Sequence, residues 1–215
     1  MIGIDISIHN HDRYKDKGGI IPWDKLKKAG VEFVIIRTGY GQSWVEPDFQ
    51  KDVNDAHSVG MKVGAYHYSY ALTASEAMQE AIVCKNIIEK SGVFLELPVF
   101  FDMEDEDGYK KRHSFSFNRK NITSICAAWL EQIKPLNSGL YASFSWFEDW
   151  IDWKKLHKEF GCPIWNAQIS GVDDLQGYMW QFTFNMNIDE HEWDADVIYD
   201  NVHKAGLDPW SQFKV

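Results

Sequence analysis

The stretch FVIIRTG at residues 33–39 is an almost unbroken run of apolar and β-branched residues. A run of this kind is typical of a strand that is buried on both faces, as in a parallel sheet covered by helices. A helical segment at residues 23–30 precedes it and ends in a glycine, and another helical segment at residues 48–59 follows it. This order predicts βαβ units with right-handed crossovers.

The same alternation continues toward both ends of the chain. About eight strands predict an α/β fold, an irregular (β/α) TIM-like barrel with helices mainly in the first half and loops or hairpins in the second. A doubly wound sheet is the alternative, although no GxGxxG pattern follows the first strand. We further expect helices at residues 75–90, with Ser75 as the N-cap, and 118–133, and strands at residues 2–7, 63–70, 98–104, 140–145, 163–169, 178–184 and 194–199.

The composition is that of one soluble globular domain over residues 1–215, with 45% hydrophobic and 25% charged residues. A formal charge of −10 disfavours nucleic-acid binding, which needs a basic surface. No window approaches the roughly 18 apolar residues of a membrane span, so no membrane contact is expected. Residues 1–5 lack the basic and apolar regions of a secretory signal, which predicts a chain without a leader.

Cysteine and aromatic residues add two expectations. Cys84, Cys126 and Cys162 are widely spaced and form no CxxC pattern, so they are interpreted as buried thiols. Aromatic residues make up 15% of the chain, a surplus that favours a site where rings stack on flat ligands such as sugars.

The sharpest candidate site is the sequence PVFFDME at residues 98–104. Side chains alternate along a strand, so Asp102 and Glu104 share a face and lie about 6.6 Å apart. At an effective dielectric near 20 their repulsion is about 2.5 kcal/mol, which predicts that one of them stays protonated near neutral pH. An acid beside an anion suits the cleavage of a glycosidic bond. The other interpretation of the acidic run at residues 102–107 is a solvated loop or a cation site.

Other polar residues fall near the ends of the predicted strands, where barrel enzymes carry their chemistry. Asp5 lies late in the first strand, Arg37 ends the second, and Asp194 and Asp196 belong to the last. The polar stretch at residues 105–117 looks like an insertion that could reshape the rim of a groove.

The chain resembles glycoside hydrolase family 25, the Chalaropsis-type lysozymes found in phage endolysins and bacterial autolysins. Any one of the matching blocks is weak, but their order along the chain is specific. The blocks are GIDIS (3–7), VIIR (34–37), GAYHY (64–68), PVFFDME (98–104), LYAS (140–143), IWNAQ (164–168) and MWQF (179–182).

This resemblance implies a (β/α) barrel that cleaves the β-1,4 bond between N-acetylmuramic acid and N-acetylglucosamine in peptidoglycan. It gives Glu104 the role of general acid, and it gives Asp102 the role of orienting the substrate acetamido group or stabilising the positive centre. Asp5 and Asp194 are the further catalytic carboxylates, with Asp196 as the other candidate for the last of them. The expected substrate-binding residues are Arg37, Tyr66, Tyr141, Trp165, Gln181 and Asp196. Tyr66 and Tyr68 are expected to point to opposite sides of their strand.

The expected partner is therefore the glycan strand of bacterial peptidoglycan, bound by a monomer at the cell wall without a metal or other cofactor. A holin-released endolysin and a trimmed secreted enzyme are both compatible with the sequence. Two other functions stay open: a non-catalytic peptidoglycan-binding module on the same fold, and a hydrolase that uses these acids to hold a divalent cation.

Overall fold

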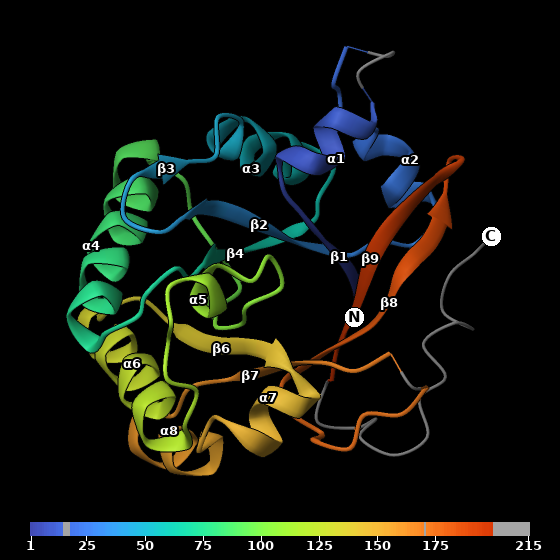
Figure 1. Cartoon of the computed structure of the whole chain (residues 1–215). Coiled ribbons are helices and arrows are strands. Elements are labelled where there is room, and N and C mark those ends of the chain that lie inside the picture. Colours follow the sequence, from blue (N-terminus) through green and yellow to red (C-terminus); the bar gives the residue numbers. More distant parts are fainter. Residues whose placement is uncertain (15–17, 170, 200–215) are drawn as a thin grey trace.

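The computed structural model describes residues 1–14, 18–169 and 171–199. In this part of the chain a nine-stranded sheet has the order β1-β9-β8-β7-β6-β5-β4-β2-β3, and an additional pairing of β1 with β2 closes it into a barrel (Figure 1). The short strand β3 extends the sheet beyond β2 and stands outside the closed ring. The predicted barrel is confirmed.

The strands match the predicted positions closely, apart from the additional β3. Their bounds are β1 Ile2–Ile6, β2 Phe33–Tyr40, β3 Trp44–Val45, β4 Lys62–Tyr68, β5 Val99–Asp102, β6 Ser138–Ser143, β7 Ile164–Ala167, β8 Met179–Ile188 and β9 His191–Ile198.

Helices connect most of the strands, and Figure 1 shows α4, α6 and α8 on the outside of the barrel and α5 in front of the strands. Their bounds are α1 Ile8–Arg13, α2 Trp23–Lys28, α3 Phe49–Ser58, α4 Ala74–Ser91, α5 Tyr109–Arg112, α6 Arg119–Gln132, α7 Phe144–Asp149 and α8 Trp153–Phe160.

The barrel is parallel except where it closes, in the second half of the chain, where hairpins are expected. Six strand pairs, from β1–β2 round to β7–β8, are parallel, but β8 and β9 form an antiparallel hairpin and β9 also runs antiparallel to β1. A hairpin needs only a short turn, whereas a parallel return would need a crossover. The last strand can therefore complete the ring without another helix.

Two expectations about the helices are wrong. The N-cap of α4 is Thr73 rather than Ser75, because the Thr73 hydroxyl accepts a hydrogen bond from the backbone N–H of Glu76 and the Glu76 carboxylate accepts one from the backbone N–H of Thr73. Loops or hairpins are expected after β6, but two helices, α7 and α8, lie between β6 and β7.

Alternate residues of the strands build two apolar layers, one inside the ring and one under the helices. On β5, Phe100 belongs to the inner layer with Trp165 and Phe33, while Phe101 belongs to the outer layer and stacks on Trp129 of α6 at 4.8 Å. The carboxyl ends of the parallel strands lie above this inner layer, where a cavity replaces apolar packing. All three cysteines are free and buried, as expected. Among the described residues, no helix is both long enough and apolar enough to cross a membrane.

Candidate active site

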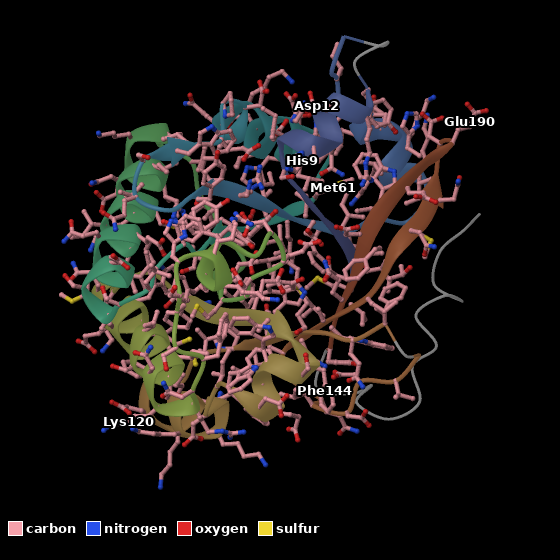
Figure 2. All side chains as sticks on the ribbon, viewed as in Figure 1. His9, Asp12, Met61, Lys120, Phe144 and Glu190 are labelled. Atoms are coloured by element: carbon pink, nitrogen blue, oxygen red, sulfur yellow. The ribbon has the colours of Figure 1, made fainter. Side chains whose placement is uncertain are left out.

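A groove of about 1160 Å³ opens at the carboxyl ends of the strands. In Figure 2, His9 marks α1 on one side of the barrel and Phe144 marks the start of α7 on the opposite side. The structure brings nearly all of the predicted site residues to this groove, and the exception, Asp196, is buried behind it. The predicted residues that line it are Asp5, Arg37, Tyr66, Asp102, Glu104, Tyr141, Trp165, Gln181 and Asp194.

Asp102 and Glu104 project into the groove from the end of β5. The strand ends at Asp102, but the backbone N–H of Met103 still donates to the carbonyl of Tyr141 on β6, so the extended pairing continues one residue further. Met103 points into the helix-facing core and is fully buried. Asp102 is 4% exposed, whereas Glu104 is half-buried and closer to the opening.

Burial is the main cause of the raised pKa values of Asp102 and Glu104. It raises the pKa of Asp102 well above its usual value, and the neighbouring Glu104 raises it further. Burial also raises the pKa of Glu104 to about 7, with Glu106 adding to the effect and Lys110 opposing it. Within the described residues, no group donates a hydrogen bond to Asp102 Oδ1. The pair therefore holds a proton near neutral pH, as its spacing predicts.

A second pair of acidic residues lies on β1 and β9, two neighbouring strands where the barrel closes. Asp5 on β1 stands opposite Asp194 on β9. Gln181 Nε2 donates to Asp5 Oδ2 at 2.6 Å, and the Tyr141 hydroxyl donates to Gln181 Oε1 at 2.7 Å. Burial raises the pKa of Asp5 well above its usual value, and the charge of Asp194 adds to that rise. This chain of hydrogen bonds fixes where the Asp5 carboxyl points.

The two candidates on the last strand occupy different places. Asp194 borders the groove, and its pKa rises to about 6, chiefly through burial, while Arg13 acts in the opposite direction. Asp196 is completely buried, and its Oδ1 accepts a hydrogen bond from Trp165 Nε1 at 2.8 Å. Burial, followed by the charge of Asp5, raises the pKa of Asp196 well above its usual value. Of the two, Asp194 is the carboxyl group that a ligand in the groove can reach.

Arg37 has a buried partner that the sequence analysis missed. Its Nε donates to Glu46 Oε2 at 2.8 Å, and both side chains are nearly inaccessible. The guanidinium carbon also lies 5.3 Å from the centre of the Trp44 ring, which stacks on Tyr40 at 4.6 Å. Arg37 thus supports an aromatic rim on β2 and β3, and only the aromatic surplus in the composition pointed to such a rim.

The tyrosines of β4 correct another expectation. Tyr66 and Tyr68 both line the groove and do not point to opposite sides, because residues two apart on a strand share a face. Tyr66 meets the Trp165 ring edge to face at 6.2 Å, and Tyr141 lies 4.3 Å from the same ring. The groove floor is therefore aromatic between its two acidic groups.

The segment at residues 105–117 holds a buried residue that the sequence analysis did not single out. Lys110 on α5 is fully buried, and its Nζ donates to the backbone carbonyls of Ser69 and Glu104. A lysine in an acidic, polar segment carries no sequence signal for burial. In the described part of the chain, no group of three or more His, Cys, Asp or Glu residues has a geometry that could hold a metal ion.

Comparisons with known proteins extend these observations. The sequence pattern of Glycosyl hydrolases family 25 matches residues 4–207. No protein with a curated description is detectably similar to the chain in sequence. Several solved structures share the fold at identities near one fifth.

The modular autolysin LytC from Streptococcus pneumoniae, solved with a synthetic peptidoglycan ligand, is 21% identical with a TM-score of 0.76, and the match covers 92% of this chain and 46% of LytC. The CTP1L endolysin is 22% identical with a TM-score of 0.73, covering 93% of this chain and 66% of the endolysin. A family 25 glycosyl hydrolase from Bacillus anthracis is 21% identical with a TM-score of 0.72, covering 94% of this chain and 90% of that protein.

The chain thus spans about half the length of LytC and about two thirds of CTP1L, whereas it matches the Bacillus protein over most of its length. The structural likenesses show the fold, and the sequence pattern covers most of the chain. The resemblance noted in the sequence is confirmed: the chain belongs to glycosyl hydrolases family 25.

Proposed function

We propose that this chain is a peptidoglycan hydrolase, a lysozyme that cleaves the β-1,4 bond between N-acetylmuramic acid and N-acetylglucosamine. The observation that carries the proposal is the pair Asp102 and Glu104, two acids with raised pKa values side by side in a groove large enough for sugar rings. Family membership supports a glycosidase. Two relatives, an autolysin solved with a synthetic peptidoglycan ligand and an endolysin, support peptidoglycan as the substrate.

In this proposal Glu104 is the general acid. It is the more accessible member of the pair, and a pKa of about 7 leaves about half of the molecules with Glu104 protonated in neutral solution. Its proton passes to the leaving glycosidic oxygen as the bond to the anomeric carbon breaks, and the resulting carboxylate then activates the incoming water. General acid catalysis of this kind is worth about 10²–10⁴-fold in rate.

Asp102 acts on the sugar whose bond breaks. Asp102 lines the groove, so its carboxyl group can accept a hydrogen bond from the substrate N–H. That contact would orient the acetamido group for attack on the anomeric carbon, and direct stabilisation of the positive centre is the other route. Asp5 and Asp194 add negative charge on the opposite wall. Retention at the anomeric carbon is expected for acetamido assistance, and inversion would exclude it.

The substrate contacts come from the aromatic floor and its polar edges. Tyr66, Tyr141 and Trp165 offer ring faces and hydroxyl groups to sugars, while Gln181 and Arg37 are held by partners that fix their orientation. Asp196 contributes indirectly, through Trp165 and Asp5. We also propose that residues 1–215 form one catalytic domain, which acts as a monomer on the bacterial cell wall.

The test is digestion of purified peptidoglycan by the wild-type chain and by Glu104→Gln, followed by mass analysis of the released fragments. We expect fragments with N-acetylmuramic acid at the reducing end, and a loss of about 10²–10⁴-fold in rate for the variant with its fold intact. Glu159→Gln, at an exposed position on α8, is the matched control and should keep its activity. Fragments with N-acetylglucosamine at the reducing end, or an active Glu104→Gln, would contradict the proposal.

A further inference from the structure

Lys110 is buried directly behind the acid pair. It lies on the short helix α5, in the segment that follows β5, and none of its side chain is accessible to solvent. Lysine is among the residues that are almost never fully buried unless their charge is paired. Its ammonium group therefore needs hydrogen-bond and charge partners that offset the lost hydration.

Those partners tie two neighbouring strand ends together. The Nζ atom donates to the carbonyl of Ser69, just past the end of β4, at 2.5 Å and to the carbonyl of Glu104, just past the end of β5, at 2.7 Å. The backbone N–H of Ser69 also donates to the carbonyl of Asp102 at 3.0 Å. The ammonium group thus bridges the backbone on which the Glu104 side chain is mounted.

The loop before α5 holds Lys110 in place. Asp105 accepts hydrogen bonds from the backbone N–H groups of Lys110, at 2.6 Å, and Lys111, at 3.0 Å. Asp107 accepts from the backbone N–H of Tyr109 and from the hydroxyl of Tyr70, which lies past the end of β4. This segment is consequently a folded cover over the ends of β4 and β5.

A buried acid balances the lysine from the other side. Glu80 on α4 is 1% exposed, and it accepts hydrogen bonds from the Ser69 hydroxyl at 2.9 Å and from the backbone N–H of Tyr70 at 2.8 Å. Ser69 therefore links Lys110 and Glu80: its backbone carbonyl accepts from Lys110, and its hydroxyl donates to Glu80. Burial lowers the pKa of Lys110, and the charges of Glu80 and Asp102 oppose that change.

Most of the other groups around Lys110 and the acid pair are carboxyl groups and tyrosine rings, and one thiol and one guanidinium complete the set. Lys110 is faced by Glu80 from α4, Asp102 from β5, Asp105 and Asp107 from its own loop, the Tyr68 ring from β4 and the Cys126 thiol from α6. The acid pair is faced by Asp5 from β1, Arg37 from β2, the tyrosines of β4 and β6, and Glu106 and Lys110 from the segment after β5.

We propose that Lys110 is a positioning residue for the acid pair: its ammonium group fixes the backbone of Glu104 and supplies a buried positive charge beside the two carboxyl groups. The inference rests on the proposed function, in which Glu104 donates the proton. A positive charge favours the ionised form of a nearby carboxyl group, so Lys110 holds the pKa values of Asp102 and Glu104 below those that burial alone would give.

The test compares Lys110→Met, which keeps the length of the side chain but removes its charge and donors, with Lys111→Met, whose wild-type side chain is exposed. In a plot of kcat against pH, activity should fall at alkaline pH as Glu104 loses its proton. For Lys110→Met we expect this alkaline limb to move up by about one pH unit. We also expect a fall of about tenfold in kcat at pH 6, with KM nearly unchanged, since a displaced acid slows the chemical step. Lys111→Met should match the wild type.

Glu80→Gln is the second variant, and it keeps the proposal testable if Lys110→Met does not fold. Removing this negative charge should move the alkaline limb of kcat to lower pH, opposite to the shift in Lys110→Met. If Lys110 and Glu80 had only a structural role, the two variants would not shift the limb in opposite directions. An unchanged limb in Glu80→Gln, or in folded Lys110→Met, would overturn the proposal.

Carboxyl-carbon NMR titration of Glu104 separates this inference from the proposed function, because it reads the pKa without a substrate. We expect the pKa of Glu104 to rise in Lys110→Met and to fall in Glu80→Gln. If these shifts occur in a chain that releases no fragments from peptidoglycan, the proposed function fails while the role of Lys110 in setting the pKa stands. If digestion is normal and the pKa does not move, only the inference about Lys110 fails.

Discussion

Besides the pair Asp102 and Glu104, Asp196 is a second place in the barrel where a buried carboxyl group holds a proton. Trp165 occupies its Oδ1, and its Oδ2 has no donor among the described residues. A hydrogen bond between Asp5 and Asp196 lowers the pKa of Asp5 and raises that of Asp196. Because only a protonated carboxyl group can donate, Asp196 donates to Asp5, and Asp5 accepts from both Asp196 and Gln181.

This assignment predicts different outcomes for two substitutions of Asp196. Asp196→Asn can still donate to Asp5 and accept from Trp165, so we expect activity within a few-fold of the wild type and little change in the free energy of unfolding. Asp196→Ala leaves Trp165 Nε1 without an acceptor and removes one of the two donors to Asp5 in a buried site, which should destabilise the fold by about 1–3 kcal/mol. Urea unfolding and peptidoglycan digestion measure these effects.

Asp194→Asn is the matched comparison, since Asp194 borders the groove and its charge acts on Asp5. We expect it to lower the rate of digestion with little effect on stability. The opposite order, an inactive Asp196→Asn beside an active Asp194→Asn, would transfer the catalytic role to Asp196.

Only some of the active-site residues could be predicted from the sequence. Asp102 and Glu104 followed from alternation along one strand, which is a local property of the chain. Lys110 and Glu46 did not, because their partners lie at other strand ends and include backbone carbonyls, which no side-chain pattern reveals. The difference between Asp194 and Asp196 depends on how β9 meets β1, and that pairing joins opposite ends of the chain.

Among the elements, α4 is the best defined by local signals. A capping box at Thr73 and Glu76 begins it, and Gly92 ends it in the left-handed conformation at φ 65°. Thr73→Ala should lower the free energy of unfolding by about 1 kcal/mol, because a helix N–H loses its acceptor. Ser75→Ala, at an exposed position inside the first turn, is the control and should change stability by less than about 0.5 kcal/mol. Equal effects in urea unfolding would argue against Thr73 as the cap.

The helices α7 and α8 were missed because they are short, whereas the longer α6 was predicted. α7 has 6 residues, too few to display a clear period of 3.6, and α8 has 8, in which only Trp153, Leu156 and Phe160 mark that period. Local signals for α8 were nevertheless present: Asp152 caps its first turn through the N–H of Lys155, and Gly161 ends it in the left-handed conformation. Reading both caps together would have found this helix.

Across the whole molecule, burial of ionisable groups makes stability depend on pH. The pKa values of Glu80 and Glu104 rise to about 7 and that of Asp194 to about 6, so the folded chain binds more protons than the unfolded chain as pH rises above about 4.5. Stability is therefore lost as pH rises through this range. His67, whose pKa burial lowers to about 4, acts in the opposite sense between pH 4 and 6.5.

His11 extends the loss of stability to alkaline pH. Its Nε2 lies 2.7 Å from Asp52 Oδ2, and this hydrogen bond raises the pKa of His11 to about 9, which gives stability that is complete below pH 6.5 and disappears as pH rises through 9. Above pH 6.5 no contribution from His67 remains, so we expect Tm to fall by about 5–10 °C between pH 6.5 and pH 9. Calorimetry at constant ionic strength measures this, and Asp52→Asn should flatten the slope above pH 7. A Tm that is constant or higher at pH 9 would mean that His11 is neutral in the folded chain.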